Sequence, residues 1–173
     1  MVDESEAAPE PAVSPNAIHL LRTTQLAHLQ LSAMADQKAS ILMGGAFVIF
    51  AIAVGQGRGA AAPLPLLILG GTAFFAALCA VTAVLPSFAA RRKVPANLLF
   101  FGSFTDLSEE EYLEALTSRL GSDAEVHRMM ARDIYQNGCV LRHKKYRMLG
   151  WAYRIFLAGL VASAAAFMWG ALR

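Results

Sequence analysis

The chain has 173 residues, enough for one ordinary domain, but 56% of them are hydrophobic and only 16% are charged. Soluble domains carry about 25% charged and 45–50% apolar residues, so the composition indicates an integral membrane protein, as does a mean hydropathy of +0.45. Two cysteines in distant segments exclude a secreted disulfide scaffold. A net charge of +2, from 15 basic and 13 acidic side chains, argues against nucleic-acid binding.

Three apolar segments predict membrane-spanning helices. A helix needs about 20 mainly apolar residues to cross roughly 30 Å of hydrocarbon. Residues 64–85 meet this length without interruption, and residues 41–54 meet it when their uncharged flanks extend the pass to 39–57. The third pass is predicted over 155–172. The chain therefore has three predicted passes, and the bilayer is its expected surroundings.

Aromatic and basic side chains indicate where these passes end and which side each flank occupies. Trp151, Tyr153 and Trp169 fit the two interfaces of the third pass, where amphipathic rings are favoured. Thirteen lysines and arginines precede the first pass or lie in 86–154, and only two fall in the opposite flanks. Cytoplasmic flanks are enriched in basic residues. We therefore expect the N-terminus and the central region to lie in the cytoplasm and the C-terminus to lie outside.

The segment before the first pass predicts a tail followed by a long helix. Residues 1–15 are rich in Glu, Ala and Pro and are predicted to be a disordered acidic tail. From Asn16, the predicted N-cap, a helix pattern over 16–38 continues into the first pass. A helix from Asn16 to Val54 would be about 58 Å long, so it should project into the cytosol.

This first helix carries an apolar seam that follows steps of four and three along one face. The seam consists of Leu20, Thr24, Ala27, Leu31, Met34, Lys38 and Ile41. Two interpretations stay open: the seam packs against the chain's own cytosolic helices, or it pairs helices between subunits.

The central region, 86–154, predicts further helices. Ser108 with Glu111 three residues later is a capping box that starts a short helix, and Ser122 with Glu125 repeats the signal at once. The second of these helices should continue straight into the third pass. No strand pattern appears. The predicted fold is therefore an all-α membrane protein with three transmembrane helices, the first and last prolonged into the cytosol as stalks, and a short cytosolic helix between.

Small residues recur every four positions in the third pass. They are Ala158, Ala162, Ala166 and Gly170. Such a ridge lets helix backbones approach closely, either within one subunit or between subunits. Three thin helices make a poor solitary membrane protein, so we expect a homo-oligomer.

The sequence offers little catalytic chemistry. The four histidines are scattered, with no pair at i, i+4 and no carboxylate at a metal-binding spacing. No nucleophile follows a strand. We expect neither an enzyme nor a bound cofactor or metal.

Two groups of charged residues are candidate sites instead. Asp36, Lys38 and Ser40 lie where the first helix enters the membrane, and they are either an ordinary interfacial anchor or a pairing with the basic cytosolic helix. A second group has the positive charge and the aromatic rings to hold an anionic ligand such as a nucleotide, although contact with acidic lipid explains the same charges. This group consists of Arg142, Lys144, Lys145, Tyr146, Tyr135, Arg91 and Arg92.

Two segments resemble a known family. Ala35-Asp36-Gln37-Lys38-Ala39-Ser40-Ile41-Leu42, leading into the first pass, is similar to the membrane entry of the transmembrane effectors of the Pycsar antiphage system. The later Asp133-Ile134-Tyr135, followed by Leu141, Lys144, Lys145, Tyr146, Leu149 and Ala152-Tyr153, resembles the approach to their last pass. The likeness covers about residues 16–172.

The resemblance implies a bacterial inner-membrane protein with a role in abortive infection. In that family a neighbouring cyclase makes cyclic CMP or cyclic UMP on infection, and the effector responds by impairing the membrane. We therefore predict an effector that oligomerises and impairs membrane integrity on a cyclic pyrimidine nucleotide signal. The alternative is a scaffolding membrane protein whose cytosolic stalk docks a partner.

Overall fold

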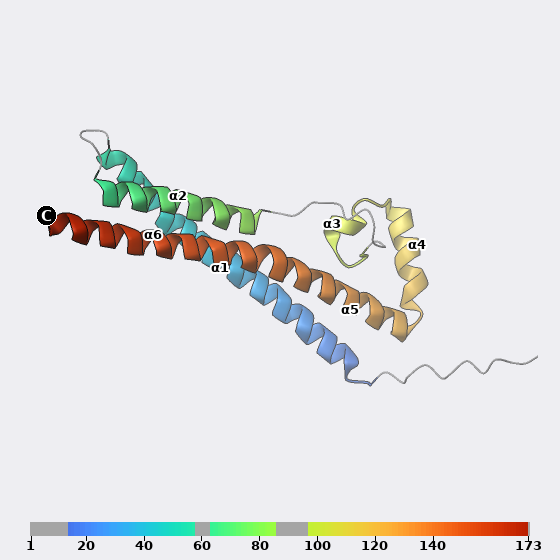
Figure 1. Cartoon of the computed structure of the whole chain (residues 1–173). Coiled ribbons are helices and arrows are strands. Elements are labelled where there is room, and N and C mark those ends of the chain that lie inside the picture. Colours follow the sequence, from blue (N-terminus) through green and yellow to red (C-terminus); the bar gives the residue numbers. More distant parts are fainter. Residues whose placement is uncertain (1–13, 58–62, 86–96, 173) are drawn as a thin grey trace, which may run out of the picture. The chain divides into compact units, whose positions relative to one another are not determined.

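The computed structural model describes residues 14–57, 63–85 and 97–172, and the regular structure within them is helical (Figure 1). Three of the helical segments are long and apolar enough to cross a membrane, and short helices lie between the second and third. The predicted all-α class is therefore confirmed. The elements are α1 (Ala17–Gln56), α2 (Leu64–Val84), α3 (Phe101–Phe104), α4 (Glu109–Leu120), α5 (Asp123–Val140), the π-helix η1 (Leu141–Tyr146) and α6 (Arg147–Ala171).

The chain divides into two compact units. The small unit combines α1 up to Leu26 with α3, α4 and α5 up to Ile134. The membrane unit combines the rest of α1 with α2, the end of α5, η1 and α6. Of the predicted features, the acidic tail up to residue 13, Arg91 and Arg92 lie outside the described residues.

The first and last helices are long, as the sequence predicts. α1 is a 40-residue helix that begins at Ala17, directly after Asn16, and it contains no proline. The side-chain hydroxyls of Thr23, Thr24 and Ser40 donate to the carbonyl four residues earlier, so these polar groups are satisfied within the helix. Asp123–Ala171, which joins α5, η1 and α6, forms 49 residues of uninterrupted helical structure.

α2 runs beside α6 in the opposite direction (Figure 1). Pro63 and Pro65 stand at its start, where their fixed φ and missing N–H are tolerated. At that end the Ser163 hydroxyl of α6 donates to the Pro65 carbonyl at 2.8 Å. At the other end Lys144 of η1 donates to the carbonyl of Leu85, the C-cap of α2. These two contacts fix the register of the pair.

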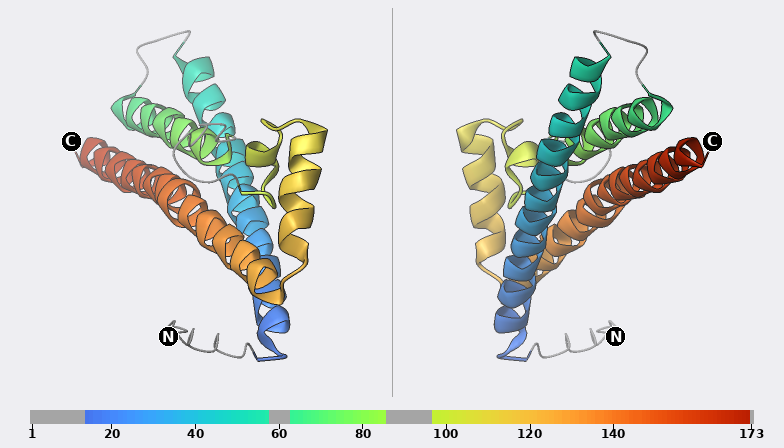
Figure 2. Two further views of the ribbon diagram at one scale, coloured as in Figure 1. Left: turned by 90° about the vertical axis from the view of Figure 1, so that its right-hand side faces the viewer. Right: turned by 90° about the vertical axis from the view of Figure 1, so that its left-hand side faces the viewer.

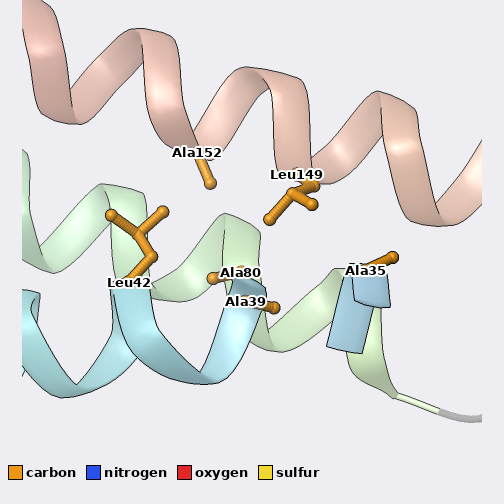
Figure 3. Close-up of a cluster of buried hydrophobic side chains, with 6 residues drawn as sticks. All are labelled: Ala35, Ala39, Leu42, Ala80, Leu149 and Ala152. Carbon is orange, nitrogen blue, oxygen red and sulfur yellow. The ribbon is translucent and has the colours of Figure 1, made fainter. Parts of the chain in front are cut away.

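Small side chains dominate the packing of the membrane unit. α1 runs at an angle to α2 and α6 (Figure 2), and the three helices meet in a cluster of four alanines and two leucines (Figure 3). Lipid tails are as apolar as leucine, so membrane helices associate through van der Waals contact between closely approaching backbones. The members are Ala35, Ala39 and Leu42 of α1, Ala80 of α2, and Leu149 and Ala152 of α6.

Glycines permit the closest approaches. A Cβ on Gly70 of α2 would lie 2.6 Å from the Cβ of Ala53 on α1. A Cβ on Gly159 of α6 would overlap the side chain of Thr72 on α2. Both glycines are buried, so each marks a point where only the missing side chain lets two backbones meet.

In the small unit, the predicted capping box at the start of α4 is confirmed. The Glu111 backbone N–H donates to Ser108 Oγ at 3.2 Å, and the Ser108 backbone N–H donates to Glu111 Oε2 at 2.8 Å. These hydrogen bonds favour the charged carboxylate and hold the pKa of Glu111 below its usual value. Phe104 of α3 packs on Tyr112 of α4, with ring centroids 4.9 Å apart, so α3 is anchored to the same helix.

Within each unit, large apolar residues of the predicted seam of α1 are not part of the packed face of the helix. Leu20, Leu31, Met34 and Ile41 are 69%, 39%, 40% and 67% exposed. The face that packs inward is an alanine-rich one about a quarter of a turn away, which contains Ala35, Ala39, Leu42 and Ala46. Within its own unit each of the four large seam residues is therefore exposed, and both interpretations of the seam stay predictions. Small side chains form most of the buried face of this helix.

Candidate functional site

A charged junction joins the first and last membrane helices. The Lys145 ammonium of η1 lies 2.7 and 2.8 Å from the two carboxylate oxygens of Asp36 on α1. It also donates to Ser32 Oγ at 2.7 Å, one turn earlier on α1. The lysine side chain is 19% exposed and the aspartate 40%. All three ammonium hydrogens of Lys145 therefore have acceptors on a single helix, α1.

The preceding residue, Lys144, joins the same segment to α2. Its ammonium donates to the carbonyl of Leu85, one of the carbonyls that a helix C-terminus leaves without an intrahelical partner. A cation is favoured at such a helix end because of the helix dipole. Two consecutive lysines thus attach η1 to both of the other membrane helices. We call Ser32, Asp36, Leu85, Lys144 and Lys145 the lysine junction.

The π-helical geometry of η1 keeps the packed face of the last helix continuous. Leu141, Lys145 and Leu149, which are buried or half-buried, recur every four residues. In an α-helix of 3.6 residues per turn such positions drift by about 40° at each step. A π turn holds more residues, because its hydrogen bonds run from i to i+5, and so it counters the drift. Beyond Leu149 the packed positions Ala152, Phe156 and Gly159 return to steps of three and four.

Two tyrosines support the junction from the same side. The Tyr146 hydroxyl donates to the Leu31 carbonyl at 3.4 Å, and the Tyr153 hydroxyl donates to the Lys38 carbonyl at 3.3 Å. Both acceptors are on α1, on either side of Asp36. The contacts between α1 and the last helix therefore extend over two turns around the ion pair.

A second polar cluster lies in the small unit. Asp133 of α5 is 6% exposed, and its carboxylate accepts from Gln25 Nε2 of α1 and from Asn97 Nδ2, each at 3.0 Å. Asn97 is itself held in place, since its side-chain oxygen accepts from the Leu99 N–H and its own N–H donates to Ser103 Oγ, both at 3.0 Å. One buried carboxylate thus joins three segments of the small unit, as a satisfied buried polar group must.

Comparison with known proteins gives the chain a family. The Pycsar effector protein domain, PycTM, matches residues 19–170. The chain belongs to the Pycsar effector family. It is therefore a membrane protein of an antiphage signalling system, and this family of membrane effectors is not known to be enzymatic. No curated protein and no solved structure matches it.

In this Pycsar effector the entry group of α1 pairs with the basic helix. Asp36 binds Lys145, as the second interpretation of this group predicts. Ser40 Oγ donates to the Asp36 carbonyl at 2.9 Å, and Lys38 is exposed beside it. Whether this pairing controls the membrane pass stays a prediction.

The described members of the predicted ligand group divide into residues that make contacts within the chain and residues that are exposed. Lys144, Lys145 and Tyr146 make the contacts within the chain described above. Arg142 is exposed and Tyr135 is 73% exposed. Lys144 and Lys145, which were expected to hold an anion, hold the helices together in this structure.

The predicted small-residue ridge of α6 is not its contact with α2. Ala158, Ala162 and Gly170 are exposed and Ala166 is half-buried, while nothing lies within 4 Å of a Cβ placed on Gly170. The close contact with α2 is made by Gly159 instead. The sequence contains a signal for it, since Ala152, Gly159 and Ala166 are small residues at a spacing of seven. Between subunits the ridge stays a prediction.

Among the described residues, no group of three or more His, Cys, Asp or Glu side chains could hold a metal ion. His28 packs against Gly138, with His28 Cε1 3.3 Å from a Cβ placed on that glycine. Its Nδ1 is buried without a hydrogen-bond partner. The lysine junction and the Asp133 cluster are therefore the polar constellations from which a function can be argued.

Proposed function

We propose that this Pycsar effector oligomerises in the bacterial inner membrane and impairs it when a cyclic pyrimidine nucleotide, cyclic CMP or cyclic UMP, reaches the lysine junction. The observation that carries the proposal is the pairing of Lys145 with Asp36. A cyclic nucleotide carries a phosphodiester anion, whose oxygens accept charge-assisted hydrogen bonds just as the carboxylate that Lys145 already binds does. The ligand and Asp36 therefore compete for one ammonium group.

The energetics of the junction suit such a competition. Exposed or partly exposed ion pairs stabilise a structure by about 0.2–1 kcal/mol. The side chains of Asp36 and Lys145 are 40% and 19% exposed, so solvent reaches both partners of the pair. Replacing Asp36 by a ligand removes the ion pair between α1 and η1 without breaking the alanine-rich packing within the bilayer. A ligand shifts the balance between two arrangements only by the difference in its affinity for them.

The consequence in the membrane is a change in helix packing. α1 is held at its cytosolic end to η1 by Lys145 and Tyr146 and to α6 by Tyr153. Loss of the first contact weakens the other two, which lie within two turns of it. The three membrane helices of one copy are too few to enclose a path for ions. Several copies whose α1 helices become free to rearrange would open such a path.

The test is ion leakage from liposomes that contain the purified full-length protein. Cyclic CMP, cyclic UMP, cyclic AMP and cyclic GMP are added one at a time, and empty liposomes serve as the control. We expect leakage with a pyrimidine nucleotide and not with the purine nucleotides. No leakage with any of the four, from protein whose insertion has been verified, would contradict direct gating and favour a stalk that docks a separate partner.

A further inference from the structure

A groove runs along the exposed side of the contact between α2 and α6, two helices of the membrane unit. It has a volume of about 590 Å³ and is lined by Phe75, Leu78, Cys79 and Thr82 of α2 and by Met148 and Ile155 of α6. The Thr82 hydroxyl donates to the Cys79 carbonyl at 2.8 Å, so its polar group is satisfied within the helix. The groove therefore offers an apolar surface along two membrane helices.

Two arginines and a tryptophan border this groove on α6. At 100° per residue, Met148 and Ile155 lie within about 20° of each other on α6. Arg147 and Arg154 form a second pair about 100° farther around the helix, and Trp151, which is 51% exposed, lies between the two pairs. The guanidinium carbon of Arg154 is 5.5 Å from the centre of the Trp151 ring. The arginine therefore leans toward the start of α6, as side chains on a helix do.

This turn of α6 lies where the membrane pass begins. The Tyr153 hydroxyl donates to the Lys38 carbonyl, and Lys38 is the last charged residue of α1 before its apolar pass. Tryptophan is favoured at the interface of a membrane, and arginine extends from this level to the headgroups. The end of the groove at Ile155 therefore adjoins the hydrocarbon, and the end at Met148 adjoins the headgroups.

The positive charge beside the groove is not balanced by the helices that form it. Neither α2 nor α6 contains an acidic residue. Arg147 and Arg154 are exposed, and among the described residues neither forms an ion pair. α2 carries no charge, and α1 has a single cation, Lys38, where it enters its pass. The border of this groove is therefore the place in the membrane unit where apolar surface and cations without a carboxylate partner coincide.

We propose that the groove binds an anionic phospholipid, with one acyl chain along its apolar walls and the headgroup beside Arg147 and Arg154. A guanidinium presents its N–H donors in a planar fork that matches phosphate oxygens. Basic pockets between membrane helices bind acidic headgroups in this way. A zwitterionic lipid has the same phosphate, but its own cation is repelled by the two arginines. The proposal does not depend on nucleotide gating.

Tryptophan fluorescence can test the site in liposomes that contain the full-length protein, because lipids with brominated acyl chains quench a tryptophan that they contact. Trp169→Phe leaves Trp151, beside the groove, as the single tryptophan. The control reporter is Phe47→Trp on α1, 70% exposed in the native chain, in a Trp151→Phe, Trp169→Phe background. Brominated phosphatidylglycerol and brominated phosphatidylcholine with the same chains are compared at equal fractions.

We expect phosphatidylglycerol to quench Trp151 several-fold more strongly than phosphatidylcholine does, and the two lipids to quench the control reporter equally. Arg147→Gln with Arg154→Gln should abolish the preference. Arg22→Gln with Arg142→Gln, which removes two exposed arginines elsewhere, should preserve it. Equal quenching of Trp151 by both lipids, or equal loss in the two double variants, would overturn the proposal.

Two further comparisons test the acyl chain. Leu78→Phe narrows the groove and should reduce the preference, whereas Leu67→Phe, three turns away on the same face of α2, should not. Soluble glycerol phosphate in excess should not compete, because it has no chain to place in the groove. Competition by glycerol phosphate, or an unchanged preference in Leu78→Phe, would mean that the arginines bind a phosphate without the groove, and the proposed lipid site would be wrong.

Discussion

Asp36 and a nucleotide phosphate would compete for Lys145, and two substitutions separate their roles. Asp36→Asn removes the competitor and leaves the cation. We expect it to raise leakage without nucleotide and to lower the half-maximal nucleotide concentration by roughly fivefold, the equivalent of about 1 kcal/mol. Lys145→Gln breaks the same ion pair but also removes the cation, so it should raise basal leakage and abolish the response. Leakage titrations with both variants measure the two effects.

Arg142→Gln is the matched control for these variants, because Arg142 is an exposed cation in the same π-helical segment. It should leave basal leakage unchanged. If Asp36→Asn and Lys145→Gln change nucleotide sensitivity in the same direction, the ion pair is only structural and the ligand binds elsewhere.

At Gly159 the contact between α2 and α6 leaves no room for a side chain. Gly159→Ala places a methyl group against the Thr72 side chain, and overpacking of this kind costs about 1–3 kcal/mol. We expect a lower midpoint in thermal unfolding of the detergent-solubilised protein. Gly170→Ala is the control on the same helix, since nothing lies within 4 Å of its Cβ position, and it should unfold like the wild type. Equal midpoints for the two variants would mean that α2 and α6 do not approach at Gly159.

At the scale of the element, the π-helix is the part whose geometry has a specific consequence. Deleting His143, an exposed residue within η1, removes one residue from the wide turn and favours an ordinary α-helix. Because a π turn holds more residues than an α-turn, the deletion leaves α5 and α6 close to their present relative rotation and changes only the spacing of Lys144 and Lys145 within η1. We expect normal membrane insertion and loss of the nucleotide response.

His143→Ala is the control for this deletion, because it removes the side chain and keeps the residue count. It should respond like the wild type. A deletion variant that still leaks on nucleotide addition would show that the π turn itself does not take part in the response.

Local rules were enough to predict several of these elements. The capping box of α4, the start of α1 and the continuity of the last helix all depend on residues a few positions apart, and the structure confirms them. The pairing of Asp36 with the basic segment was one of two interpretations, because a lone acid before an apolar pass has many suitable partners. The capping prediction was specific because both of its partners lie within four residues.

Other features could not be read from the sequence. A helix that is apolar on every side gives no periodic signal of its packed face, so the predicted seam and ridge fell on exposed faces while Ala39 and Gly159 made the contacts. The π turn has no compositional signature. The Asp133 cluster depends on Gln25 and Asn97, which are 108 and 36 residues away in the chain, and only the fold brings them together.

For the whole molecule, orientation decides whether any cytosolic signal can reach the lysine junction. Thirteen of the 15 basic residues flank the passes on the side of the junction, which predicts that this side is cytoplasmic. In the Cys79→Ala, Cys139→Ala background, Tyr135→Cys and Leu172→Cys place exposed thiols on the two sides, since the native residues are 73% and 82% exposed. A membrane-impermeant maleimide should label Leu172→Cys in intact spheroplasts and Tyr135→Cys only after permeabilisation. Labelling in the reverse order would place Lys145 and Asp36 outside the cell, beyond the reach of a nucleotide made in the cytoplasm, and the proposed gating would be impossible.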